Sequence, residues 1–460
     1  MQRDLDEQAP AQPPEKHLLI NRNFTLLWIG QSLSGLGDVI FEITLTVWIG
    51  SELAAGKSWA ALAVTGLLVA SAVPILLVGP IAGALVDRQP DKRRLLLRAE
   101  LISALLILVM IPAAGVVELP FVADYELPLT VRLIAIFTIV FLASTVAQFL
   151  RPASSVVLRD VVPDADRPRA AGLSQTTFSL SYLIGPTLAA PLLFAFGPGW
   201  ALLINALSFI ASFFFVRAIR VPDVVVDAEA MEPASARAVI HDIGDGLRFF
   251  WNSQVLKTIG IAFATCMLGL GAVNALDIFF VTENLHTSAK SYGILSSAAG
   301  AGMIVGAIIW GFLTGRVGLA RSVWIGLIGV GITMMIYARM TSFIPGVIAT
   351  FAISVIVQAV NVAIGPIMFR VTPRDFVGRV SATLNPLMNA ASLIGLIGGG
   401  LLYSTVMQNF SVTIGGIHFG PLDTIFLVTG LLCIIAGLYA TSLRIPAEEI
   451  DDATAESAAA

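Results

Sequence analysis

The sequence predicts an all-α membrane protein with twelve transmembrane helices, arranged as two pseudo-symmetric six-helix bundles. Three observations support this fold class: the composition, the spacing of long apolar segments, and a pattern shared by the two halves. Of the 460 residues, 57% are hydrophobic and 13% are charged, whereas soluble domains carry about 25% charged residues. The composition therefore excludes an ordinary soluble globule.

Twelve apolar segments are each long enough to cross a bilayer, which requires about 20 helical residues. Residues 1–23 precede the first segment and lack the apolar core of a signal peptide, so we expect a cytoplasmic tail there. The expected spans are 24–48, 60–85, 95–116, 131–150, 171–196, 200–217, 258–282, 291–314, 322–339, 345–369, 380–406 and 421–443.

The basic residues predict how the chain is oriented. If the N-terminus is cytoplasmic, all but four of the 27 Lys and Arg residues fall in cytoplasmic segments, as the positive-inside rule requires. The four exceptions are Lys57, Arg132, Lys290 and Arg339. We therefore expect a multi-pass protein of the cell membrane with both termini in the cytoplasm. The net charge of −4 argues against a nucleic-acid partner.

The longest cytoplasmic segment follows the sixth span and divides the chain. We expect an N-terminal bundle over 24–217, a linker over 218–257, a C-terminal bundle over 258–443 and a cytoplasmic tail over 444–460. The second part of the linker has apolar residues at helical spacing, which predicts an amphipathic helix on the inner leaflet; a plain connecting helix is the alternative. Its apolar face consists of Val239, Ile240, Ile243, Leu247, Phe250 and Trp251.

A repeated pattern supports the division into two bundles. Pro163 and Arg169 precede the fifth span, as Pro373 and Arg379 precede the eleventh, and both spans contain glycine. Parallel six-helix repeats around a site at the membrane midplane are typical of secondary transporters.

The loop after the second span carries the most specific motif of the chain, Gly83-Ala-Leu-Val-Asp87-Arg88, with Arg93 and Arg94 following. Gly83 allows a close helix approach, and the arginines either bind carboxylates or only hold the loop in the cytoplasm. The segment resembles motif A of the major facilitator superfamily. This resemblance implies the major facilitator fold, and it implies that Gly83, Asp87 and Arg88 form a conformational gate between the halves.

Further segments resemble the macrolide-efflux and enterobactin-exporter-like branch of drug:proton antiporters. They are Asn21-Arg22-Asn23-Phe24 before the first span and the stretch from Arg151-Pro152 to Arg169. In the fifth span, Gly185-Pro186 is similar to the antiporter motif C, with alanines in place of its two final glycines. The superfamily's motif B is absent, because Arg132 lies at the outer mouth of the fourth span. The branch implies proton-coupled efflux of an amphiphilic, drug-like or siderophore-like compound by alternating access.

The first span contains four polar residues on one helical face, Gln31, Ser34, Asp38 and Glu42. A central Asp costs about 2.5–3.5 kcal/mol to insert, so this face is expected to point away from lipid. Asp38 and Glu42 are one turn apart, and like charges in a low dielectric discourage joint ionisation. We expect the pair to carry a proton or bind a cation; a hydrogen-bonded structural cluster is the alternative.

Other spans carry polar residues at helical spacing, which makes these residues candidates for the proton or substrate site. They are Asn274 and Asp277 in the seventh span, Gln358 and Asn361 in the tenth, and Asn385 and Asn389 in the eleventh. An outer vestibule is the alternative for Asp277, and interhelical hydrogen bonds are the alternative for the amides. Four spans are interpreted as having no ionised residue in their central parts: the third, sixth, ninth and twelfth. In the superfamily, the corresponding helices support the helices that line the cavity.

These patterns predict a secondary active transporter that uses a proton gradient and needs no cofactor or metal. We expect a small-molecule substrate, surrounding membrane lipid and a monomeric protein. An enzyme is not expected, because no nucleophile or metal-ligand cluster is visible at membrane depth. The alternatives are a uniporter or importer of a small molecule, and a non-transporting receptor or scaffold with this fold.

Overall fold

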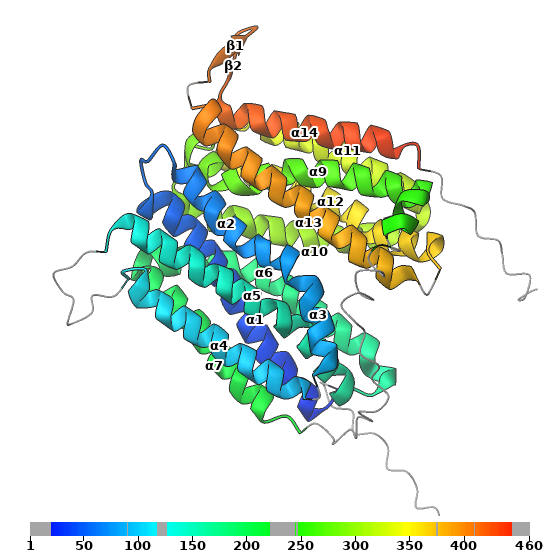
Figure 1. Ribbon diagram of the computed structural model, residues 1–460. Coiled ribbons are helices and arrows are strands. Elements are labelled where there is room, and N and C mark those ends of the chain that lie inside the picture. The colour runs from blue at the N-terminus through cyan, green and yellow to red at the C-terminus, as the bar shows by residue number, and fades with distance from the viewer. Residues whose placement is uncertain are drawn as a thin grey trace, which may run out of the picture.

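The computed structural model describes residues 20–89, 91–116, 127–220, 244, 247–373, 376–408 and 410–443. Within these ranges, twelve helices are long and apolar enough to cross a membrane. Figure 1 shows them as two bundles, one built from the first half of the chain and one from the second. The predicted fold class is confirmed.

In its described residues the N-terminal bundle has seven α-helices, because the second expected span is divided in two. After α2, the segment Gly79-Pro80 starts a new helix, and proline has no amide hydrogen to continue the earlier one. The bounds are α1 Arg22–Trp48, α2 Ala60–Leu77, α3 Gly79–Arg88, α4 Lys92–Ala113, α5 Leu129–Val161, α6 Arg167–Phe196 and α7 Pro198–Arg217, with a π-helical turn at Ile49–Leu53 after α1.

The C-terminal bundle, as far as the structure describes it, has six α-helices and a short β-hairpin. The helices are α9 Gln254–Phe279, α10 Tyr292–Val317, α11 Leu319–Tyr337, α12 Phe343–Val371, α13 Val377–Leu401 and α14 Pro421–Ala440. π-Helical turns follow α9 at Phe280–Asn284 and α13 at Leu402–Val406, and the 3-10 turn Ala289–Ser291 precedes α10.

The hairpin was not expected from the sequence. Strands β1 Val412–Ile414 and β2 Ile417–Phe419 are antiparallel, with Val412 opposite Phe419. Gly415 and Gly416 connect them with φ angles of 60° and 79°, a conformation that favours glycine in tight hairpin turns.

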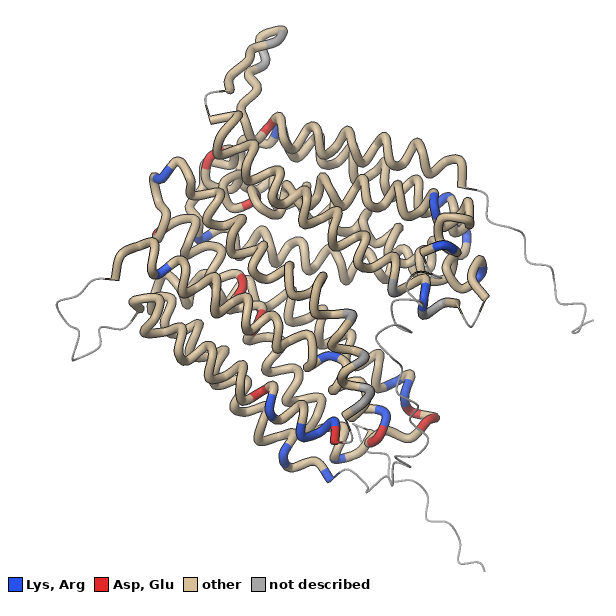
Figure 2. The backbone as a smooth tube through the Cα atoms, viewed as in Figure 1, with Lys and Arg blue, Asp and Glu red and all other residues tan. Residues whose placement is uncertain are grey.

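The two ends of the helix array differ. We call the end with the hairpin the hairpin end, and the end where α1 begins and α14 finishes the terminal end. Figure 2 shows most Lys and Arg residues at the terminal end, while isolated acidic residues lie among the helices.

Asn21 and Asn23 connect the start of α1 to two other helices. The side chain of Asn21 accepts a hydrogen bond from the Phe24 amide at 2.8 Å and donates one to the Val161 carbonyl at 2.6 Å. Asn23 donates to the Arg220 carbonyl at 2.8 Å. The Asn-Arg-Asn-Phe segment therefore fixes α1 against the ends of α5 and α7.

The described end of the linker packs onto the C-terminal bundle. Phe250 is fully buried against Leu256, Val380 and Leu384, and a Cβ at Gly260 would overlap its ring. The expected membrane-facing position of Phe250 is therefore wrong, because a glycine on α9 leaves space for the ring inside the protein. Leu247 and Trp251 are 44% and 49% exposed, and residues 221–243 lie outside the described residues.

Helices α9 and α13 cross so closely that two glycines of α13 have no space for a side chain. A Cβ added at Gly395 would overlap the Leu268 carbonyl, and one added at Gly399 would lie 2.6 Å from the Ala272 Cβ. Small residues at such crossings allow backbones to pack directly in membranes. Gly398, one residue before Gly399, has no atom within 4 Å of an added Cβ.

We predict that Gly395→Ala destabilises the protein by about 1–3 kcal/mol, because the added methyl group overpacks the crossing. Thermal unfolding of the purified protein in detergent measures the effect. Gly398→Ala is the matched control, since it changes the same helix by the same group without a contact. Equal melting temperatures for the two variants would contradict the close crossing.

Candidate functional site

The polar face of α1 divides into two parts. Near the terminal end, Ser34 is buried and the Gln31 amide donates a hydrogen bond to Glu100 of α4 at 2.8 Å. Further along the helix, Asp38 and Glu42 are exposed. The second part of the expected stripe is therefore the more accessible one, since Gln31 is half-buried and Ser34 is buried.

Glu100 is the acidic residue that the sequence analysis missed. It is fully buried, and its Oε1 accepts hydrogen bonds from Gln31 and from the Ser212 hydroxyl of α7 at 2.7 Å. No described residue forms a hydrogen bond with Oε2. The sequence analysis expected no ionised residue in the central part of the third span, and it did not consider Glu100 near the start of that span, whose polar partners Gln31 and Ser212 come from other helices.

Glu100 belongs to a group of polar residues around Asp38. Asp38 interacts electrostatically with Glu100, Glu42 and Arg151, and with the side chain of Asn205 on α7. Arg151 was assigned to a loop, since the fourth span was expected to end at residue 150. In the structure α5 continues to Val161, so Arg151 is part of a helix and provides positive charge near the acids.

Glu42 has electrostatic partners in both bundles. It interacts electrostatically with Tyr182 of α6 and with Tyr292, the first residue of α10. Tyr292 also interacts with Asp277 of α9. Electrostatic interactions therefore connect Glu42 of α1 with Tyr292 of the other bundle.

Asp277 lies inside the C-terminal bundle, near the hairpin end. It is partly buried, and it accepts a hydrogen bond from the Tyr337 hydroxyl of α11 at 3.1 Å. Its neighbour Asn274, one turn earlier on α9, is exposed.

The amides on α12 and α13 are placed differently from one another. Gln358 is buried, and Asn361 is exposed and directs its amide toward the Gln358 oxygen at 3.4 Å. Asn385 and Asn389 on α13 are both exposed. The accessible amides of these two helices are thus Asn361, Asn385 and Asn389.

The bundles are in contact near the hairpin end. The hydroxyls of Thr187 on α6 and Ser297 on α10 are 2.6 Å apart, and Gln408 donates to the Ser58 carbonyl at 3.3 Å. A Cβ at Gly300 would lie 2.6 Å from the Tyr182 carbonyl, so α6 and α10 meet backbone to backbone. In Figure 1 the two bundles diverge from this contact toward the terminal end.

Gly185 and Pro186 lie where α6 contacts both α1 and α10. A Cβ at Gly185 would lie 2.6 Å from the Val39 side chain, and a Cβ at Gly293 would overlap the Pro186 carbonyl. The antiporter-like motif is therefore located at the seam between the bundles.

The residues of the expected conformational gate are less fully described. Gly83 lies within α3 and has no atom within 4 Å of an added Cβ. Asp87 and Arg88 are the last residues of α3, and their side chains lie outside the described residues. The gate role of the three residues stays a prediction.

Comparison with known proteins gives one family over nearly the whole chain. A family model described as transmembrane secretion effector matches residues 18–457. Macrolide efflux protein A of Streptococcus pyogenes is 23% identical over 406 residues, which cover 87% of this chain and 94% of that protein. The multidrug efflux pump Tap of Mycolicibacterium fortuitum is 25% identical over 353 residues, which cover 72% of this chain and 78% of that protein.

Solved transporter structures share the fold. The nucleoside transporter NupG matches with a TM-score of 0.64 and 13% identity, over 92% of this chain and 98% of that chain. A bacterial homologue of the iron transporter ferroportin, solved in an inward-facing state, matches with a TM-score of 0.65 and 16% identity, over 93% of this chain and all of that chain.

We predict that a membrane-impermeant thiol reagent labels Asn361→Cys but not Ser103→Cys. Asn361 is exposed on α12, whereas Ser103 is 2% exposed on α4, and thiol reactivity requires access. The native cysteines are suitable background, because Cys266 and Cys433 are 2% and 0% exposed. Labelling of purified protein, followed by mass spectrometry, measures the difference. Equal labelling of both variants would contradict the assigned exposure.

Proposed function

Because the chain belongs to the transmembrane secretion effector family of the major facilitator superfamily, it is a secondary transporter of that superfamily, and we propose that it exports an amphiphilic, drug-like or siderophore-like compound in exchange for protons. The terminal end lies in the cytoplasm in this proposal, as the basic residues gathered there favour. The relatives whose names include macrolide efflux and multidrug efflux support export as the direction.

The exposed acids of α1 are the observation that carries the proton-coupling part of the proposal. Asp38 and Glu42 lie on a membrane-spanning helix and are nevertheless exposed, and Glu42 interacts with Tyr292 of the other bundle. Ionisable residues at such positions are typical of proton pathways in transporters.

Burial supplies the physical link between protonation and conformation. If the bundles close at the terminal end, the face of α1 that carries Asp38 becomes enclosed. Enclosing an ionised carboxylate without a full set of partners costs several kcal/mol, whereas a neutral carboxyl needs only hydrogen bonds. Proton binding at Asp38 therefore favours the state that is closed at the terminal end, and proton loss favours the open state.

Glu100 acts on Asp38 in this mechanism without touching the substrate. It is enclosed by α1, α4 and α7 and interacts electrostatically with Asp38. A negative charge on Glu100 would make proton binding at Asp38 more favourable, and Gln31 and Ser212 hold the carboxyl in the position from which it acts.

We predict that Asp38→Asn lowers proton-driven efflux by about 5- to 150-fold, the usual range for loss of one coupling interaction. The amide cannot exchange a proton, so transport should no longer respond to a pH gradient. A panel of fluorescent amphiphiles in proteoliposomes, acidified on the side opposite the terminal end, measures the flux. Glu52→Gln is the matched control, since Glu52 is an exposed acid in the turn after α1.

The outcomes of this assay separate the proposal from its alternatives. Gradient-driven flux in the wild type and in Glu52→Gln, but not in Asp38→Asn, supports proton antiport. Flux that is independent of the gradient in all three proteins indicates a uniporter. Absence of flux for the whole panel, with retained binding of a compound, favours a receptor or scaffold.

A further inference from the structure

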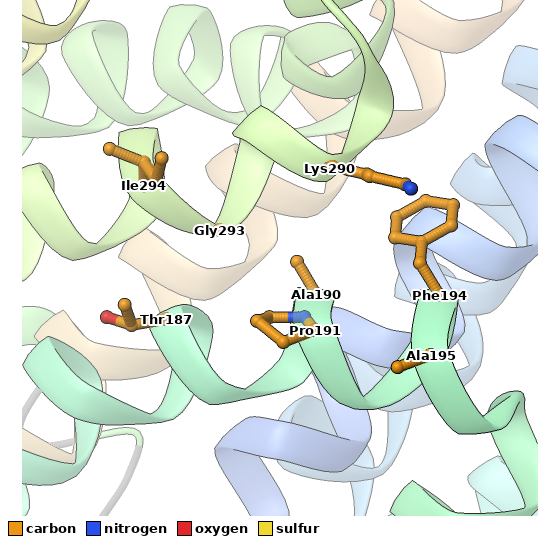
Figure 3. Close-up of a pocket in the computed structure, with 8 residues that line it drawn as sticks. All are labelled: Thr187, Ala190, Pro191, Phe194, Ala195, Lys290, Gly293 and Ile294. Carbon is orange, nitrogen blue, oxygen red and sulfur yellow. The ribbon is translucent and has the colours of Figure 1, made fainter.

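A pocket of about 450 Å³ lies between α6 and α10 near the hairpin end. Figure 3 shows its two walls. Thr187, Pro191, Phe194 and Ala195 come from α6, and Lys290 and Ile294 come from the 3-10 turn before α10 and from α10 itself. The volume is within the range of pockets that bind small molecules, about 300–1,000 Å³.

The pocket is on the opposite side of α6 from the acids of α1. Gly185 of α6 faces Val39 of α1. Phe194 follows Gly185 by about two and a half helical turns, and so points away from α1. Pro191 and Ala195 are exposed, and Ile294 is 50% exposed. The pocket therefore opens outward at the seam, toward the bilayer, and is separate from the candidate transport site.

The chemistry of the pocket is that of an anionic amphiphile site. Its walls are mostly apolar, and the Lys290 ammonium lies 5.1 Å from the centre of the Phe194 ring at the hairpin end. In the described part of the chain, no Asp or Glu forms an ion pair with Lys290. A groove beside lipid chains that ends in a cation at the level of the headgroups is complementary to a lipid with a negative headgroup.

We propose that this pocket binds one acyl chain of an anionic phospholipid from the surrounding leaflet, with the headgroup phosphate paired to Lys290. The proposal does not depend on the proposed function. The lipid contacts both bundles, because α6 and α10 each supply one wall. It therefore binds best while Thr187 and Ser297 remain in contact, and it stabilises the state that is closed at the hairpin end.

Native mass spectrometry of the full-length protein tests the proposal. The protein is purified in detergent, mixed with equal amounts of phosphatidylglycerol and phosphatidylcholine, and the retained lipid is counted. We expect the wild type to retain phosphatidylglycerol preferentially. Lys290→Gln should lower this retention about fivefold, which is the usual effect of one lysine near a lipid surface.

Two further variants separate the site from general lipid binding. Lys57→Gln removes another exposed lysine of the hairpin end that does not line the pocket, and it should retain phosphatidylglycerol like the wild type. Ala195→Trp fills the groove from an exposed position and leaves Lys290 in place, and it should lose the lipid. Equal retention of both lipids by the wild type, or wild-type retention by Lys290→Gln and Ala195→Trp, would overturn the proposal.

Discussion

An acidic side chain inside a membrane has to be kept from lipid, and the architecture of this protein depends on how it meets that requirement. Asp38 and Glu42 are exposed on α1, and Glu100 is enclosed by Gln31 and Ser212. Helices α1, α4 and α7 must pack together to supply these hydrogen bonds. The position of α1 follows from this packing, and with it the direction in which its acids face.

In the proposed mechanism, the contact between the two bundles has to separate. At the seam of α6 with α10, glycine packs against backbone, as at Gly300 and Tyr182, and the hydroxyls of Thr187 and Ser297 lie 2.6 Å apart. Tyr292 of α10 interacts electrostatically with Glu42 of one bundle and with Asp277 of the other, so in the proposed mechanism a change of charge on either acid is felt close to this contact.

The spans and the fold class could be predicted from the sequence because each helix in lipid must form all of its backbone hydrogen bonds internally. A long apolar segment therefore indicates a transmembrane helix. The features that were missed depend on contacts between segments. Glu100 is tolerated through Gln31 and Ser212, and the burial of Phe250 depends on Gly260. The end of α5 was placed too early, because Pro152 within a membrane helix does not have to end it. The helical face that carries Asp38 could be predicted from the residue spacing. Its exposure could be seen only in the structure.

The most direct test of the central claim is a spin-label distance across the terminal end, measured at acidic and at neutral pH. Labels at Ser155→Cys on α5 and Arg321→Cys on α11 occupy exposed positions on opposite bundles. Protonation is expected to shift the distance distribution toward shorter values at acidic pH, and Asp38→Asn should give one distribution at both values. An unchanged pH response in Asp38→Asn would contradict the account.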